Sequence, residues 1–427
     1  MEKIRFNSAG IDIGSQKIFI GLESKEVASF GTFTSDFRLA SDYLKENGIT
    51  TVAMESTGTY WVILYDILQA DGFDVWLVDG RQTRQVPGRK TDVKDCQWIQ
   101  QLHSYGLLNR CFVAKGKMKE LRSYQRLRED HIRSAAMHVN HMQKALIEMN
   151  LRLPEVLSQI HGISGMAIIE AILSGEREPQ RLLLLCHSSV IKNKSEAVLK
   201  SLEGFYTHEG LFVLKQAYEA YQFYQRQIKE CDGMLMTVLQ DINGNQTEED
   251  PTNRKAVRHN KPDIENLGGQ MLKIFGQRDA TILPGITDYS WLQIYSETGE
   301  DLTKWPSEKH FTSWLGLSPG QNNSGKKQRN KRKGRPLAGQ IFRKLAQSLL
   351  QSKRISFGAF GRRLRGRKGP QIAIKAVARK LAVQYWRLMV KGKEFIEEGV
   401  THYEAILLQQ KEKYIKKLAL ELNMEFK

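Results

Sequence analysis

Short apolar runs alternate with amphipathic stretches over the first quarter of the chain. Two apolar runs flank a turn-rich break inside residues 9–22, a pattern that predicts a β-hairpin. A third apolar run follows at residues 27–33. Beyond it the pattern predicts helix 36–46, strand 50–54, helix 60–69, strand 73–78 and helix 91–105. The first part of the chain is therefore expected to be a mixed α/β domain.

The rest of the chain is expected to be mostly helical. Long amphipathic stretches at residues 117–150 and 211–239 predict two long helices. These helices form either an antiparallel coiled-coil arm, which would serve dimerisation, or the core of an ordinary bundle. The expected parts are an α/β domain at 1–114, a helical or coiled-coil region at 115–240, a linker at 241–265, a basic C-terminal domain at 266–393 and a helical tail at 394–427.

Four acidic residues stand out against the α/β pattern. Asp12 lies inside the first apolar run, and Glu55 ends a later one. Asp92 and Asp95 are three residues apart near a helix start, so they share a face, although capping alone would also explain Asp92. Carboxylates that converge at a strand end repel one another, and Mg²⁺ or Mn²⁺ relieves the repulsion. Two such ions can clamp the attacking and leaving oxygens of a phosphodiester.

Positive charge is concentrated in one segment of the 427-residue chain. Residues 309–393 hold 23 of the 64 Lys and Arg residues and none of the 47 Asp and Glu residues. Such a field is typical of proteins that bind polyanions, whereas an ordinary surface intersperses both signs. The candidate nucleic-acid-binding residues are Arg81, Arg84, Arg89, Lys90, Lys326, Lys327, Arg329, Lys331 and Arg332.

Cysteine use and hydropathy indicate the cellular compartment in which the protein is expected. The four cysteines include no Cys-x-x-Cys pair, which is typical of reduced thiols and argues against a zinc ribbon or a disulfide framework. The mean hydropathy is −0.44, and no long apolar stretch predicts a membrane span. The sequence shows no signal peptide. We therefore expect a cytoplasmic protein.

The predicted order of elements, three strands followed by helix, strand, helix, strand and helix, is that of a ribonuclease H-like domain. Together with the four acids, the segments Lys90-Thr91-Asp92 and Lys94-Asp95 make this part resemble the RuvC-like domain of the DEDD transposases of bacterial insertion sequences. These enzymes are also known as bridge-RNA-guided serine recombinases. The family's C-terminal transposase domain is similar to Leu283-Pro284-Gly285-Ile286, Trp314-Leu315-Gly316-Leu317-Ser318-Pro319 and Ser324-Gly325.

The resemblance covers about residues 9–113 and 270–390 and implies a mechanism. Asp12, Glu55, Asp92 and Asp95 take the places of the family's metal-binding acids, and Ser324 that of its nucleophile. The implied function is DNA strand cleavage and exchange, guided by a bridge RNA, in dimers that pair into a tetramer. The chain departs from the family pattern at Asp79-Gly80, where Asn-Pro is frequent, and at residues 330–335, where an Ile-Ser-Lys-x-Gly-like segment is usual.

Three other functions are compatible with parts of the pattern. In a metal-dependent nuclease or junction resolvase, water would attack and Ser324 would only bind phosphate, a role typical of serines among Asn, Gly and Lys residues. An actin-like sugar or metabolite kinase would explain Asp12-Ile13-Gly14, but it has no use for the basic segment. A non-catalytic nucleic-acid-binding protein would not need four acids.

Overall fold

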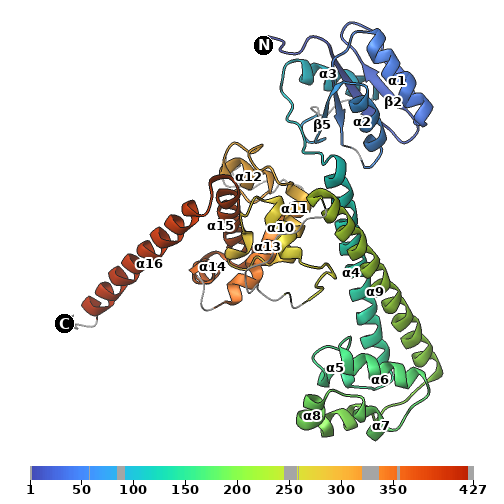
Figure 1. Ribbon diagram of the computed structural model, residues 1–427, viewed down its shortest axis with the longest axis vertical. Helices are drawn as coiled ribbons and strands as arrows, with labels where there is room; N and C mark the ends of the chain where they lie inside the picture. Colours follow the sequence, from blue (N-terminus) through green and yellow to red (C-terminus); the bar gives the residue numbers. More distant parts are fainter. Residues whose placement is uncertain are drawn as a thin grey trace. The chain divides into compact units, whose positions relative to one another are not determined.

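The computed structural model describes residues 2–56, 58–83, 92–244, 257, 259–319, 336–352 and 356–421 (Figure 1). The chain divides into two compact units, Met1–Ala114 and Lys115–Lys427. Each unit has hydrophobic clusters of its own, and none of these clusters mixes residues of both.

A five-stranded sheet forms the centre of the first unit. Its strands are β1 (Ser8–Ile13), β2 (Ile18–Gly21), β3 (Ala28–Phe30), β4 (Thr51–Glu55) and β5 (Asp74–Val78), and their order is β3-β2-β1-β4-β5. The hairpin strands β1, β2 and β3 pair antiparallel. β4 and β5 extend the other side of β1 with parallel pairing, which requires the helical crossovers between them.

Side chains alternate between the two faces of this sheet because successive residues of a strand point to opposite sides. Ile11, Ile13, Val52 and Met54 pack with the helices α1 (Thr34–Glu46) and α2 (Trp61–Ala70). On the opposite face, Ala53 and Val78 pack with Ile99 and Leu102 of α3 (Asp92–Ser104). Each face therefore has its own apolar cluster, and among the described helices of this unit α3 covers the face toward which Gly10 and Asp12 point.

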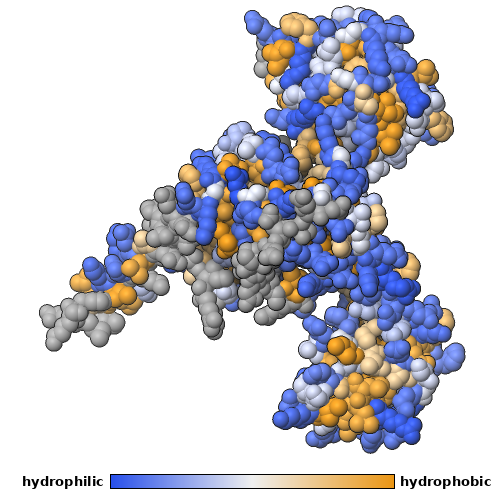
Figure 2. Space-filling model, viewed as in Figure 1, coloured by the Kyte–Doolittle hydropathy of each residue, from blue (hydrophilic) through white to orange (hydrophobic). Residues whose placement is uncertain are grey.

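Two long helices, α4 (Gly116–Glu148) and α9 (His208–Asn243), pack side by side in the second unit (Figure 1). They run antiparallel, because Lys117 pairs with Asp241 at 2.8 Å while His138 stacks on Tyr224 further along. At the far end of the pair lie α5 (Leu153–Val156), α6 (Ile163–Leu173), α7 (Pro179–Leu184) and α8 (Ser188–Ser201). Exposed apolar side chains gather on and beside these short helices (Figure 2), including Ile163, Leu184 and Phe205.

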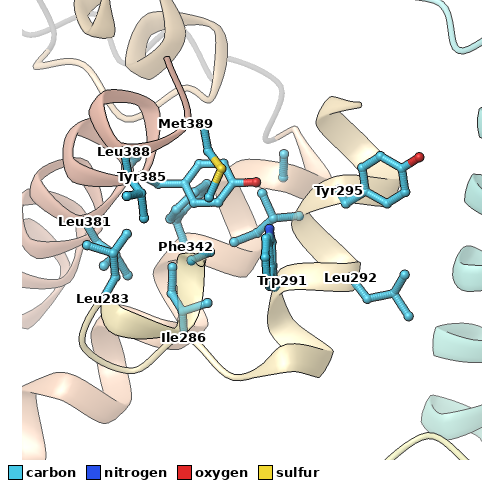
Figure 3. Close-up of a cluster of buried hydrophobic side chains, with 14 of the residues drawn as sticks. Leu283, Ile286, Trp291, Leu292, Tyr295, Phe342, Leu381, Tyr385, Leu388 and Met389 are labelled. Atoms are coloured by element: carbon cyan, nitrogen blue, oxygen red, sulfur yellow. The ribbon is translucent and has the colours of Figure 1, made fainter. Parts of the chain in front are cut away.

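The remaining helices enclose the largest hydrophobic cluster of the second unit (Figure 3). They are α10 (Leu267–Ile274), the 3-10 helix η1 (Ala280–Ile282), α11 (Asp288–Thr298), α12 (Glu308–Trp314), α13 (Leu337–Gln351), α14 (Ser356–Lys368) and α15 (Pro370–Lys391), followed by α16 (Glu394–Glu421). Trp291, Phe342 and Tyr385 are among its largest fully buried side chains. Leu283 and Ile286, the two ends of the segment Leu283-Pro284-Gly285-Ile286, face the same cluster (Figure 3).

The prediction of a mixed α/β first part followed by helices is confirmed. The predicted strands and long helices differ from the observed ones by a few residues at their ends. Within the described residues, no helix combines the length and the apolar content that a membrane span requires.

Candidate functional site

Asp12 and Glu55 lie side by side on neighbouring strands. The parallel register pairs Gly10 with Ala53 and Ile11 with Met54, so Asp12 and Glu55 follow as the next residues of both strands. Neighbouring strands are about 4.8 Å apart, and residues at the same level point to the same face. Both acids are half-buried, at the carboxyl ends of β1 and β4. Their carboxylates therefore share the face that α3 covers.

Two glycines let α3 approach this face closely. Gly10 and Gly21 are partners in the β1–β2 register. A Cβ at Gly21 would lie 2.7 Å from the Gln97 nitrogen and 2.8 Å from the Cys96 carbonyl carbon, and a Cβ at Gly10 would collide with the backbone of Cys96. Distances below 3 Å do not occur at real Cβ atoms, so any larger residue would displace the helix. The backbone of α3 thus rests on the two strands.

Asp12 of β1 and Asp95 of α3 both act on the thiol of Cys96. Burial, together with the negative charges of Asp12 and Asp95, raises the pKa of the Cys96 thiol to about 12. Both carboxylates therefore lie near one buried thiol, which stays protonated at neutral pH. A protonated thiol is a poor metal ligand, so the carboxylate oxygens are the donors that this face offers.

Two residues that follow β5 determine the position of the Glu55 carboxylate. The Thr83 hydroxyl donates a hydrogen bond of 2.6 Å to Glu55 Oε2. A Cβ at Gly80 would lie 2.7 Å from Glu55 Cδ, so a residue without a side chain leaves room for the carboxylate. Gly80 belongs to the pair at which this chain departs from the family's Asn-Pro. Sequence reasoning did not single out Thr83; its only signal is a hydroxyl a few residues after β5.

Arg81, a predicted phosphate-binding residue, is engaged locally in this structure. Its Nε lies 2.9 Å from Asp79 Oδ1 and 3.0 Å from Oδ2, and the same carboxylate raises the arginine pKa. Burial raises the pKa of the nearby Cys111 thiol to about 11. To bind a phosphate, the Arg81 guanidinium would have to release the Asp79 carboxylate or contact the carboxylate and the phosphate together.

The other predicted site residues fall on parts that the structure does not fully describe. Asp92 begins α3, but its side chain is outside the described residues. Ser324 and the basic residues Arg84, Arg89, Lys90, Lys326, Lys327, Arg329, Lys331 and Arg332 also lie outside them. Among the side chains that are described, no three of His, Cys, Asp and Glu form a group that could hold a metal ion. The donor chemistry of Asp12, Glu55 and Asp95 suits Mg²⁺ or Mn²⁺, and a metal group would need Asp92 as well.

Comparison with known families gives two matches on separate parts of the chain. Residues 9–150 match a family model described as a DEDD transposase of the IS110 type, and these residues include all four acids. Residues 280–360 match a model described as the transposase of the IS116/IS110/IS902 family. No curated protein matches the chain. Both models describe an enzyme that cleaves and transfers DNA strands, and the chain belongs to the IS110 family of DEDD transposases.

Proposed function

We propose that the first unit is a RuvC-like, ribonuclease H-type nuclease domain in which Asp12, Glu55, Asp92 and Asp95 hold Mg²⁺ or Mn²⁺. The observation that carries the proposal is the adjacency of Asp12 and Glu55 on the face where Gly10 and Gly21 seat α3. The strand order β3-β2-β1-β4-β5, with a parallel pair on each side of β4, supports the same assignment.

The reaction of this transposase is proposed to be a transesterification at a DNA phosphodiester. Bound divalent ions would supply charge neutralisation at the phosphate. Ser324 Oγ loses its proton and forms a bond to phosphorus, while the bond to one DNA ester oxygen breaks and that oxygen takes up a proton. The phosphoserine link keeps the ester energy, so a DNA hydroxyl can reverse the step and rejoin strands without ATP.

The covalent step is tested by denaturing electrophoresis of end-labelled DNA incubated with Mg²⁺ and protein. Wild type should give a shifted band that protease removes, and Ser324→Ala should give none while still binding DNA. Ser348→Ala is the matched control, because Ser348 is an exposed serine of α13 that bonds only to the Leu345 carbonyl among the described contacts. Free cleaved ends with both wild type and Ser324→Ala would instead establish water as the nucleophile.

The metal assignment is tested with Asp12→Asn and Glu55→Gln. Both variants should stop cleavage, keep the fold, and lose the rise in unfolding temperature that Mg²⁺ gives to wild type. Asp42→Asn is the control, because Asp42 belongs to α1, which covers the opposite face of the sheet. An unchanged Mg²⁺ shift in Asp12→Asn would refute the assignment.

A bridge RNA and a homo-oligomer, a dimer or a tetramer on DNA, complete the proposal, as does a coiled-coil role for α4 and α9. The RNA and the oligomer rest on the family resemblance, whereas the coiled-coil role rests on the amphipathic spacing of the two helices, for which the core of an ordinary bundle is the alternative. Sequencing the RNA that copurifies with the chain tests the bridge RNA. Light scattering with and without DNA tests the oligomeric state.

A further inference from the structure

The short helix α14 carries five cations in seven consecutive positions. Arg362, Arg363, Arg365, Arg367 and Lys368 are all exposed. Like charges three and four residues apart destabilise an isolated helix. Arg365, Arg367 and Lys368 lie in the last turn, where positive charge suits the negative end of the helix dipole. One or two cations would be enough for that interaction. The charge density therefore exceeds what the helix requires for its own stability.

The opposite side of α14 is packed tightly on its neighbours. Phe357 belongs to the large cluster of the second unit. A Cβ at Gly361 would lie 2.8 Å from Val377 of α15, and one at Gly358 would lie 2.7 Å from the Leu349 carbonyl of α13. Such contacts leave no room for α14 to rotate or slide. The helix holds its cationic face in a fixed orientation on a packed core.

The five cations of α14 differ in their local contacts. Arg362 donates to the Leu350 carbonyl at 3.1 Å and also bonds Ser352, so it closes the end of α13. Arg365, Arg367 and Lys368 form no ion pair or side-chain hydrogen bond with any residue that the structure describes. The segment from 309 to 393 has no acidic residue that could pair with them locally. An outside polyanion would therefore meet cations that give up no described partner.

We propose that the exposed face of α14 is a docking surface for the phosphate backbone of duplex DNA. It lies almost entirely beyond residues 280–360, which match the family model, and it includes none of the basic residues predicted for the site. Single strands and RNA loops are bound by stacking bases on aromatic rings. Phe357 is buried and Phe360 is covered by Lys380 at 4.1 Å, so this face offers no exposed ring. A fixed array of cations suits sequence-independent contact with a regular backbone.

The test is the salt dependence of binding to a 30-base-pair duplex of arbitrary sequence, measured with the full chain in EDTA. Each phosphate contact contributes about 0.9 to the slope of log K against log salt. Arg363→Gln, Arg365→Gln and Arg367→Gln together should lower the slope by about 2 to 3. Between 50 and 200 mM salt, wild type should then weaken about 40-fold more than the variant, which is the consequence of a slope difference of about 2.7.

Two matched variants separate the effect of this surface on binding from the effects of net charge and of folding. Replacing Lys144, Lys215 and Lys229 with Gln removes the same charge from exposed positions of α4 and α9, and it should leave the slope unchanged. Arg363→Lys, Arg365→Lys and Arg367→Lys should retain the wild-type slope. An unchanged slope in the Gln variant, or a change only with an RNA duplex or single strand as the probe, would overturn the proposal. Binding in EDTA does not depend on cleavage, so failure of the metal or serine chemistry leaves this result intact.

Discussion

At the scale of single residues, the site depends on a glycine, because any side chain at that position would collide with an acidic site residue. Gly80 leaves the space that the Glu55 carboxylate occupies, and Thr83 fixes that carboxylate with a hydrogen bond. Sequence reasoning found Glu55 because an acid at the end of an apolar run is unusual. It could not find the contact with Gly80, because that contact depends on how the turn after β5 folds back over β4.

Gly80→Ala should reduce DNA cleavage by about 100-fold, since a displacement of about 1 Å in a reacting group has that effect. The added Cβ would lie 2.7 Å from Glu55 Cδ and would push the carboxylate aside. Cleavage rates at saturating Mg²⁺ check this. Gly233→Ala is the control, because Gly233 faces open space in α9 and the change should leave cleavage unaffected. Equal rates for Gly80→Ala and wild type would contradict the prediction.

His103 makes the first unit sensitive to acid. Its side chain is fully buried, its Nε2 lies 2.9 Å from Thr51 Oγ1, and its Nδ1 has no hydrogen-bond partner among the described residues. Burial and the positive charge of Arg5 lower the pKa of His103 to about 4, against the opposing negative charge of Asp74. In the unfolded chain a histidine has a pKa of about 6.5. Between these values the unfolded state binds a proton that the folded state excludes.

Unfolding free energy should therefore be unaffected by His103 above pH 6.5, fall by about 3 kcal/mol as the pH drops from 6.5 to 4, and change no further below pH 4. Urea unfolding at several pH values measures this. His103→Gln removes the titrating group while an amide can still bond to Thr51, so the variant should lose that part of the pH dependence. The same slope in both proteins would assign it to other groups.

At the scale of elements, polar contacts join the base of the long helix pair to α11. Arg128 is buried, and it donates to Asp232 of α9 at 2.5 Å and to the Tyr289 hydroxyl at 2.6 Å. Arg126 binds both oxygens of Glu297, at 2.8 and 2.9 Å. These contacts link residues more than 100 positions apart. Amphipathic spacing predicted both long helices, but no local pattern predicts which polar residues meet between them.

Arg128→Ala should cost about 3–5 kcal/mol of unfolding free energy, because it leaves the Asp232 carboxylate buried and unpaired. Arg128→Met combined with Asp232→Leu should recover most of that loss, since well-packed apolar residues can replace a buried ion pair. Chemical denaturation of the two variants checks this. A double variant no more stable than Arg128→Ala would show that the other contacts of Arg128, with the Tyr289 hydroxyl and with the Asn260 carbonyl at 3.2 Å, carry the stability.

The short helices of the second unit show where periodicity fails. Within the predicted helical region, α5 and α7 were not predicted as separate helices, because four and six residues are too few for a helical period and the apolar run around Leu182 has no polar face. α8 has 14 residues, but the sequence analysis did not single it out as a helix of its own. The strands and the longer helices were predicted because their periods extend over several turns or across a whole hairpin. The adjacency of Asp12 and Glu55 follows from the parallel pairing of β1 and β4, whereas the close seating of α3 on Gly10 requires a partner about 90 residues away.

At the scale of the whole molecule, the two units have separate hydrophobic clusters. We therefore expect calorimetry to show two unfolding transitions. The His103→Gln change should alter the pH response of one transition, and Arg128→Ala should lower the temperature of the other. Residues 1–114 expressed alone should reproduce the first transition. A single transition that both substitutions shift would mean that the units unfold together.

All four cysteines have thiol pKa values that burial raises, to about 12 at Cys96 and about 11 at Cys111. Because the thiolate is the form that reacts with maleimides, the native chain should give little labelling background near neutral pH. One cysteine introduced at the exposed position of Arg365 would then carry a fluorophore alone, without removal of any native thiol. The fluorescence of that single probe would then report the binding of DNA to α14, because the native thiols would carry little label.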